Sequence, residues 1–522
     1  MNISGLLPWQ PAHAKQLLAA LWRYGAALDA SDTGTGKTYA ALAVCRELKI
    51  VPLVIGPKNG RATWERAAKQ MEVEIEYANY EKVRGRRMLR GGMQVDTLRL
   101  IENRGDLFDT PVSVVGLRGG KVVFNKRCTH SDATDYVNIG RSANEQKFDF
   151  ETEFGEYVFK QPFFVGQENT SESEWIVEKK YGSGSFVQFK NSYAAIFFDE
   201  VHRCSGSKSL QSKLLIAAKR SAKFVVGISA TVADDPQQMK ALGYALGLHQ
   251  LNGKFGFRPW LLRHGCTLDK ETNRITISYD TNRQSTAFAS LHKELFPSRG
   301  ARMRKSEIPD FPHSKLDIKL LTAEGKADKL VGELHDLHEQ YKEQATQTGS
   351  WVHAAQQLEL LMVPDVVELA EDAVAEARVA IFCNYQATRE ALTEALQKKF
   401  GFDRVGFVDG TQVGASGERQ RRNFIDRYQE NQLAAIVLNA GAGGENISLH
   451  DPTGKVEREA FIFPQDSARR LKQILGRVDR AQGANSLQWL LYFNVPQHEK
   501  AAARVLQRMT NLELLNDGDS LL

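Results

Sequence analysis

The sequence has few cysteines, and none of them is arranged in a pair. Five cysteines are scattered over 522 residues, and no Cys-x-x-Cys pattern occurs. Neither a disulfide framework nor a zinc site of the common kind is therefore supported. No apolar run approaches the roughly 20 residues that span a membrane, and the start, Met1-Asn2-Ile3-Ser4, lacks the pattern of a secretion signal. A reducing, cytoplasmic environment without membrane contact is expected.

A strong excess of charge is also missing. The chain has 68 Lys and Arg against 63 Asp and Glu, which gives a net charge of +5 and a pI of about 8.7. This mild basicity is compatible with a nucleic-acid partner but does not indicate one by itself. The hydrophobic and charged contents, 42% and 25%, are typical of globular proteins. The length predicts about three domains.

The chain does contain a phosphate-binding pattern near its start. An apolar run at 26–28 precedes it, a helical pattern follows it, and the loop itself reads Ser31-Asp32-Thr33-Gly34-Thr35-Gly36-Lys37-Thr38. We expect the loop N–H groups and the helix N-terminus to cradle the phosphates of ATP. Lys37 would reach the β/γ oxygens, and the Thr38 hydroxyl would bind Mg²⁺. Ser31 replaces the usual first glycine, but a small residue still allows close approach. The flanking pattern disfavours a chance glycine-rich loop.

Two adjacent carboxylates follow an apolar run further along the chain. Residues 194–198 predict a buried strand, and Asp199 and Glu200 stand at its carboxyl end, where ligands bind in open α/β sheets. Asp199 is expected to hold Mg²⁺ and Glu200 to polarise the attacking water. The alternative, a structural pair that caps a helix, is disfavoured by the preceding phosphate loop.

Apolar runs and helical patterns alternate in two parts of the chain, which predicts an α/β protein with two parallel sheets. Between them, residues 90–190 have short β-branched and aromatic segments broken by Gly and Asn, which predicts a β-rich insertion. We expect a first ATP-binding domain at 1–245 with the insertion inside it, a connecting region at 246–325 and a second domain at 326–522. The second domain supplies arginines that can neutralise charge on the γ-phosphate.

With these motifs in place, the chain resembles superfamily 2 helicases and translocases. It looks in particular like the Swi/Snf-like branch and the phage and large-virus members akin to strawberry notch-type helicases. Residues 199–202 match the DEAH-type box, and Ser229-Ala230-Thr231 match the motif that couples hydrolysis to domain movement. The run 473–480 matches the last helicase motif. The resemblance covers nearly everything except 90–190 and implies two tandem RecA-like P-loop domains.

The resemblance also implies roles for individual residues. Gln10, in Pro8-Trp9-Gln10, would read adenine. Gln473, Arg477 and Arg480 would act at the γ-phosphate, with Arg480 the first choice for the arginine finger and Arg477 the second. Further expected positions are Gly444 at the nucleotide and, at nucleic acid, Lys58, Asn79, Arg84 and Asn384. The loop around Gly444 departs from the family pattern, and the insertion lengthens the spacing between the first two motifs.

The function that the resemblance implies is that of an ATP- and Mg²⁺-dependent DNA helicase, which couples ATP hydrolysis between two RecA-like domains to movement along DNA and its unwinding. Single-strand, forked or branched DNA and replication, recombination or repair proteins are the expected partners of a monomer. The expected location is the cytoplasm of a bacterial cell, including a phage-infected one.

The alternatives are a double-strand DNA translocase that does not separate strands and an RNA helicase. A small-molecule phosphotransferase or an inactive binding module fits the motifs less well. The insertion is expected to engage DNA and set substrate preference.

Overall fold

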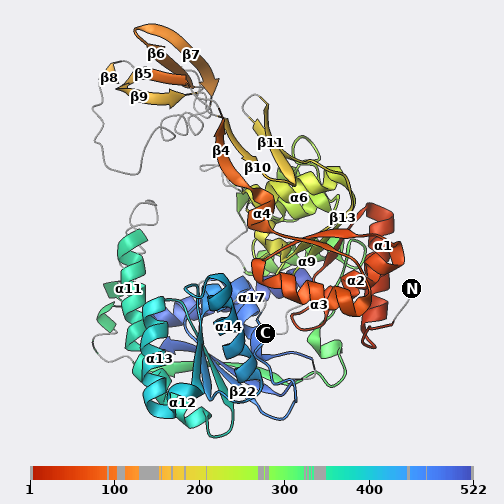
Figure 1. The fold of residues 1–522 in the computed structure, drawn as a ribbon, viewed down its shortest axis with the longest axis vertical. Helices are drawn as coiled ribbons and strands as arrows, with labels where there is room; N and C mark the ends of the chain where they lie inside the picture. Colours follow the sequence, from red (N-terminus) through yellow and green to blue (C-terminus); the bar gives the residue numbers. More distant parts are fainter. Residues whose placement is uncertain are drawn as a thin grey trace. The chain divides into compact units, whose positions relative to one another are not determined.

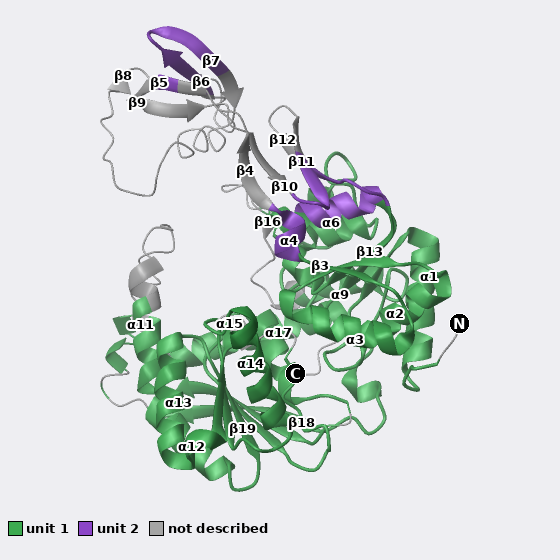
Figure 2. Ribbon diagram, viewed as in Figure 1, with its two compact units in different colours: residues 1–79, 193–212, 222–522 green, residues 80–192, 213–221 purple. Residues whose placement is uncertain are grey.

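The structure is a computed structural model that divides into two units, drawn in different colours in Figure 2. Unit 1 comprises residues 1–79, 193–212 and 222–522, and unit 2 comprises residues 80–192 and 213–221. The residues described are 4–518, apart from the following stretches: 91–92, 103–111, 129–151, 154–155, 166–167, 182–183, 207–208, 269–274, 277–280, 323–324, 326–327, 331, 334–347, 444–446, 466 and 482. Within these described stretches, no helix is long and apolar enough to cross a membrane.

Unit 1 contains two six-stranded parallel sheets, each with its own helices (Figure 1). The sheet that carries the phosphate-binding loop defines the first lobe, and its strand order is β17-β1-β14-β13-β2-β3. Its inner strands are continuous apolar runs because both faces of a parallel sheet are covered. The strands are β1 (Ala26–Asp29), β2 (Pro52–Gly56), β3 (Glu76–Asn79), β13 (Tyr193–Asp199), β14 (Ala222–Ile228) and β17 (Gly300–Ala301).

Three amphipathic helices cover one face of the first-lobe sheet: α1 (Gln10–Tyr24), α2 (Lys37–Leu48) and α3 (Arg61–Met71). Leu17, Val44 and Trp64, one from each helix, are buried against strand residues such as Val54 and Phe197. This burial fixes the helix N-terminus at Lys37 over the carboxyl ends of the strands. The later helices of this lobe are α7 (Lys240–Ala245), α8 (Phe257–Arg263) and α9 (Thr281–Leu295), with a small hairpin of β15 (Thr267–Leu268) and β16 (Ile275–Thr276). Helix α6 (Leu210–Ser221) lies mostly in unit 2.

The second lobe is built on the other parallel sheet, with strand order β18-β23-β22-β19-β21-β20. Alternate residues of its strands enter two cores, so that Ile381 packs with α12 and α13 while Phe382 packs with α16 and α17. The strands are β18 (Ser314–Leu321), β19 (Arg378–Cys383), β20 (Val405–Val408), β21 (Ala435–Asn439), β22 (Arg458–Ile462) and β23 (Ser486–Phe493). The helices are α11 (Thr348–Leu361), α12 (Val363–Ala373), α13 (Gln386–Phe400), α14 (Gly414–Gln429), α15 (Ala440–Gly443), α16 (Ala468–Val478) and α17 (Pro496–Asp517).

The region 246–325 does more than connect the two lobes. β17 pairs with β1 in the first sheet, and β18 pairs with β23 in the second. The predicted connecting region therefore contributes an edge strand to each lobe, and the first lobe extends past residue 245 to Ala301. Short edge strands such as β17 carry little hydrophobic pattern of their own, so the predicted boundary fell too early.

Unit 2 is the predicted β-rich insertion, and its strands are antiparallel. A five-stranded sheet has the order β7-β6-β5-β9-β8, and a four-stranded sheet has the order β12-β11-β10-β4. The elements are α4 (Tyr80–Arg84), β4 (Arg86–Arg90), β5 (Met93–Glu102), β6 (Val112–Arg118), β7 (Lys121–Cys128), β8 (Thr152–Glu153), β9 (Glu156–Val165), β10 (Glu168–Glu172), β11 (Ile176–Tyr181) and β12 (Gly184–Phe189). The predicted α/β fold with two parallel sheets and an inserted β region is thus confirmed.

Candidate active site

The phosphate-binding loop runs from the end of β1 to the start of α2. Gly34 and Gly36 have φ values of +84° and +88°, a backbone conformation that glycine adopts without steric cost. The Lys37 ammonium donates to the carbonyls of Ser31 and Asp32, both at 2.9 Å. Burial lowers the pKa of Lys37, while the nearby charges of Asp29 and Glu200 favour its charged form. The loop carbonyls therefore hold the Lys37 ammonium inside the loop, where a phosphate-binding lysine is needed.

Gln10 lies against this loop. Its Nε2 donates to the carbonyls of Thr35 at 3.2 Å and Gly36 at 3.4 Å, and its Oε1 accepts from the Leu7 N–H at 2.9 Å. The indole of Trp9 also donates to the Thr35 carbonyl, at 3.3 Å. The predicted Pro-Trp-Gln segment is thus brought to the nucleotide loop and holds its backbone. The contact of Gln10 with adenine stays a prediction.

Asp199 and Glu200 stand at the carboxyl end of β13, as predicted. The Trp64 indole donates to Asp199 Oδ2 at 3.0 Å, which orients this carboxyl group. Burial, reinforced by the charge of Glu200, raises the pKa of Asp199. Burial acts in the same direction on Glu200, but the hydrogen bond and charge of His202 and the charge of Lys37 outweigh it and lower the pKa. The hydrogen bond and charge of His202 therefore favour the charged form of Glu200.

The backbone at Glu200 is unusual, with φ +56° and ψ +53°. This left-handed conformation is rare for a residue with a long side chain and costs of order 1 kcal/mol. It turns the chain sharply between β13 and the short helix Val201–Cys204. A strained backbone of this kind persists when contacts with the surrounding structure enforce it, and such positions are common at functional sites.

Oxygen donors suited to Mg²⁺ are present at this position. Thr38 and Asp199 carry the hydroxyl and carboxylate oxygens that a hard cation prefers. The pKa of Asp199 is raised by burial and by the charge of Glu200, and a divalent cation would offset both effects. The residues therefore fit the predicted metal.

A hydrogen-bonded network joins the carboxylates to Ser229-Ala230-Thr231, which follow β14. His202 Nδ1 lies 2.9 Å from Ser229 Oγ and 3.2 Å from Glu200 Oε2. Ser229 Oγ also donates to Glu200 Oε2 at 3.3 Å, and Thr231 Oγ1 lies 3.3 Å from His202 Nδ1. The motif expected to couple hydrolysis to movement therefore contacts the expected catalytic carboxylate directly.

The second lobe reaches this network through α16. Gln473 Nε2 lies 3.1 Å from His202 Nε2, so the predicted residue contacts the DEAH-type box. One turn on, Gly476 packs so closely against Thr33 that an added Cβ would lie 1.8 Å from its Oγ1. Glycine at 476 is therefore required for α16 to lie on the phosphate-binding loop.

Arg477 lies in the last turn of α16, and Arg480 lies two residues beyond its end. Both donate to the Ile447 carbonyl, Arg477 at 3.3 Å and Arg480 at 3.4 Å. The Arg480 side chain passes over Gly34, where an added Cβ would lie 2.9 Å from Arg480 Cδ. Burial lowers the pKa of Arg480, while Asp479 and Glu200 favour its charge. The structure thus places Arg480 against the phosphate-binding loop at Gly34, while the hydrogen bond of Arg477 is to Ile447.

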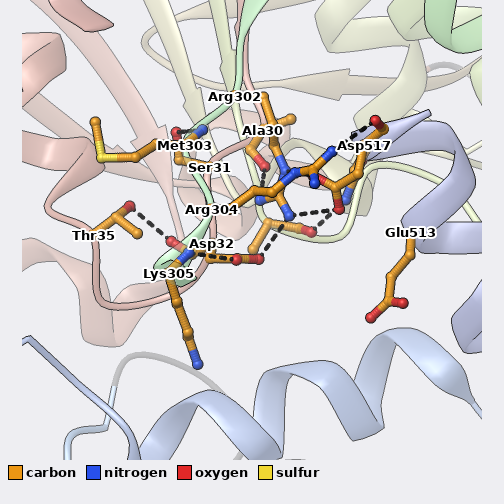
Figure 3. Close-up of polar contacts among 12 residues, drawn as sticks. Ala30, Ser31, Asp32, Thr35, Arg302, Met303, Arg304, Lys305, Glu513 and Asp517 are labelled. Carbon is orange, nitrogen blue, oxygen red and sulfur yellow. Dashed lines mark hydrogen bonds and ion pairs between the residues drawn. The ribbon is translucent and has the colours of Figure 1, made fainter. Parts of the chain in front are cut away.

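A cluster of charged side chains surrounds Asp32 and was not predicted (Figure 3). Arg302 Nη2 lies 2.9 Å from Asp32 Oδ1, Lys472 Nζ lies 3.8 Å from the same oxygen, and the Lys305 N–H donates to Oδ2 at 3.1 Å. The Asp32 N–H donates to the Met303 carbonyl at 3.0 Å. Asp32 was expected to meet the nucleotide; its N–H and carboxylate instead bind residues 302–305 and α16. The cluster borders a cavity of about 480 Å³.

The predicted nucleic-acid residues are less uniform. Lys58 forms an exposed ion pair with Glu418 of the second lobe, at 2.7 Å. The Asn384 side chain donates to Glu359 and to the Pro464 carbonyl and accepts from Gln465, so nucleic acid would have to displace these partners. Two other predicted positions are half-buried. Asn79 lies at the end of β3 in unit 1, and Arg84 lies in α4 in unit 2. Gly444 lies outside the described residues.

Comparison with known proteins adds one similarity over the whole length. The chain is 26% identical over 535 residues to "Putative ATP-dependent RNA helicase L364" of Acanthamoeba polyphaga mimivirus, which covers 98% of this chain and 84% of that protein. The chain is thus similar over nearly its whole length to a viral protein named as a helicase. No protein-family model matches it.

Solved structures similar to this chain include two of S. cerevisiae Dbp5, bound to RNA and ADP BeF3. For the first, the identity is 11%, the TM-score is 0.41, and the match covers 96% of this chain and 87% of Dbp5. For the second, a single-residue variant of Dbp5, the identity is 11%, the TM-score is 0.39, and the coverage is 96% and 88%. Superposition at this level is loose, and the ligands of Dbp5 carry no information about this chain.

Proposed function

We propose that this chain is an ATP-dependent DNA helicase or translocase whose site is completed by both lobes. The contact that supports this most directly is Gln473 to His202, because it links the last helicase motif of the second lobe to the DEAH-type box of the first. Arg480 over Gly34 supports the same reading. A phosphotransferase built on one domain would not need a second lobe at the phosphate-binding loop.

In this proposal, ATP binds with its phosphates in the loop around Lys37. Glu200, held charged by His202, orients and polarises the attacking water, and Arg480 neutralises the charge that develops on the γ-phosphate. Mg²⁺, bound through Thr38 and Asp199, would balance the remaining phosphate charge. Loss of the γ-phosphate removes the group that both lobes contact, which releases α16 from the loop and moves the lobes relative to each other.

RNA is the second candidate substrate, favoured by the name of the mimivirus relative. That relative is 26% identical, so its substrate is carried over here only as an alternative. DNA is retained as the first candidate because the motifs resemble the Swi/Snf-like branch. RNA carries 2′-hydroxyls that a protein can contact and DNA does not.

The test is the ATPase rate of the full chain with single-strand, duplex and forked DNA and with matched RNA, together with strand displacement on the forked substrates. We expect DNA to stimulate hydrolysis and forked DNA to be unwound. Stimulation by duplex without displacement would identify a translocase, and stimulation by RNA alone would identify an RNA helicase. A chain that hydrolyses no ATP with any of them would contradict the proposal.

A further inference from the structure

Helix α17 belongs to the second lobe at its start and contacts the first lobe at its end. Ala502, Val505 and Met509 are buried in the second-lobe core. The last turn lies against α9 of the first lobe, where the His292 ring bonds the Leu515 carbonyl through Nδ1 at 3.1 Å. Gly518 ends the helix with φ +78°, and an added Cβ would lie 2.7 Å from the His292 ring. Residues 302–313 connect the two lobes along the chain. Helix α17 is therefore a second connection between them, made by non-covalent contacts.

Asn516 reaches the coupling motif from the last turn of α17. Its side chain is fully buried, and its Nδ2 donates to the Ala230 carbonyl at 2.9 Å. Ala230 is the central residue of Ser229-Ala230-Thr231, and both flanking hydroxyls contact His202. A side chain of the second lobe is thus one residue away from the network that holds the catalytic carboxylate.

Asp517 reaches the phosphate-binding loop through two arginines (Figure 3). Its carboxylate accepts from Arg302 at 2.7 and 2.9 Å and from Arg304 Nε at 3.0 Å. Arg302 in turn donates to the Ala30 carbonyl at 2.7 Å and pairs with Asp32. Asp517, Arg302 and Asp32 therefore form a continuous ion chain from α17 to the loop.

A carboxylate at position 517 does not serve the helix itself. The C-terminal end of a helix carries partial negative charge, so an aspartate there is unfavourable by about a few tenths of a kcal/mol or more. Arg302 and Arg304 supply the compensation, and both come from the segment between the lobes. The position of Asp517 is therefore explained by the contact between lobes and not by helix stability.

We propose that Asn516 and Asp517 are positioning residues that couple the second lobe to hydrolysis. Leu515, Asn516 and Asp517, here called the α17 tip, clamp the coupling motif and the phosphate-binding loop while the rest of α17 moves with the second lobe. This inference rests on the proposed ATPase function. Neither side chain touches the reacting atoms; each acts through Ala230 or Arg302, so that α16 sits with Arg480 over the loop.

The first experiment separates binding from turnover in the full chain. Asp517→Asn and Asn516→Leu keep side-chain size but remove the carboxylate and the donor. We expect each to lower kcat at least about tenfold, since a charged or buried hydrogen bond is lost. The dissociation constant of a fluorescent ATP analogue should stay within about twofold, because the loop itself is intact.

Asp517→Glu, which keeps the charge, should recover part of the rate. Arg504→Ala, on the exposed side of α17, is the matched control and should behave as wild type.

The second experiment does not depend on activity. Dyes attached at the exposed positions Lys69→Cys and Lys398→Cys, in a Cys128→Ser background, report the distance between lobes by energy transfer; the four described cysteines are buried. We expect Asp517→Asn and Asn516→Leu to lower transfer without nucleotide, and Arg504→Ala to leave it unchanged. Unchanged transfer, or an equal kcat loss in Arg504→Ala, would overturn the inference. If the wild type hydrolysed no ATP, the proposed function would fail while energy transfer still tested the α17 tip.

Discussion

The two lobes share a sheet plan but differ in the charges at the site. Each has six parallel strands with helices against an apolar core. The first lobe contributes the phosphate-binding loop and the carboxylates Asp199 and Glu200. The second contributes Gln473, Arg477 and Arg480 from α16 and the residues that follow it. The two lobes therefore have the same kind of fold but contribute different charged residues to the site. Each lobe alone lacks the charges that the other supplies.

The largest expected effect comes from removing the contribution of the second lobe. Arg480→Ala should lower kcat on the order of 10³-fold, because an arginine finger stabilises transition-state charge, while ATP affinity stays nearly constant. Steady-state hydrolysis and direct nucleotide binding measure the two quantities. Arg477→Ala is the matched variant. A normal rate for Arg480→Ala together with a large loss for Arg477→Ala would move the finger to Arg477.

Removing the contribution of the first lobe should cost somewhat less. Glu200→Gln keeps size and hydrogen bonding but cannot orient and polarise water as a carboxylate does, so turnover should fall roughly 10²-fold. Binding of ATP should persist, and single-turnover hydrolysis measures the chemical step. DNA-stimulated turnover at the wild-type rate in this variant would contradict the role of Glu200.

The first lobe carries an insertion for which the second has no described counterpart. Deleting part of the insertion tests whether it sets the preference among DNA substrates. Arg90 and Glu168 face each other across β4 and β10, so a short Gly-Ser turn can replace residues 91–167 and leave the four-stranded sheet closed. We expect ATP hydrolysis to persist and discrimination among forked, branched and single-strand DNA to fall about tenfold, as loss of one stacking contact would give. Competition binding measures the preference; unchanged preference would make this part of the insertion a spacer or a docking module for a partner protein.

The smallest effect is expected where the lobes share an exposed ion pair. Lys58→Ala should weaken DNA binding and reduce the slope of log affinity against log salt by about one. Glu418→Ala is the control, since it frees Lys58 and should leave the slope unreduced. The pair is exposed and weak, so phosphate can displace it. Equal slopes in Lys58→Ala and wild type would remove Lys58 from the DNA path.

The sequence predicted the parts of the site that are local. Lys37, Glu200 and Arg480 each follow from a short motif beside an apolar run, because strand, loop and helix meet within a few residues. It did not predict that the carboxylate of Asp32 would bind Arg302, or that Asn516 would reach Ala230. Those partners are separated by roughly half the length of the chain, and no local pattern records a contact of that kind.

Predicted roles were also refined where a side chain has competing partners. Gln10 was predicted to read adenine, which stays a prediction, and in the structure its amide binds loop carbonyls. Asn384 was assigned to nucleic acid from the resemblance, whereas its side chain is bound by Glu359, whose pKa burial raises to about 7. Hydrogen-bonding choices of this kind depend on packing, which residue type and spacing do not specify.

The left-handed backbone at Glu200 has a consequence for engineering. Glycine or asparagine would fit that conformation better than glutamate. Either replacement would relieve the backbone strain but would also remove the carboxylate that His202 and Ser229 contact. Stabilising design on this scaffold should therefore hold residue 200 fixed, because the proposed function needs its carboxylate, and gain its stability elsewhere.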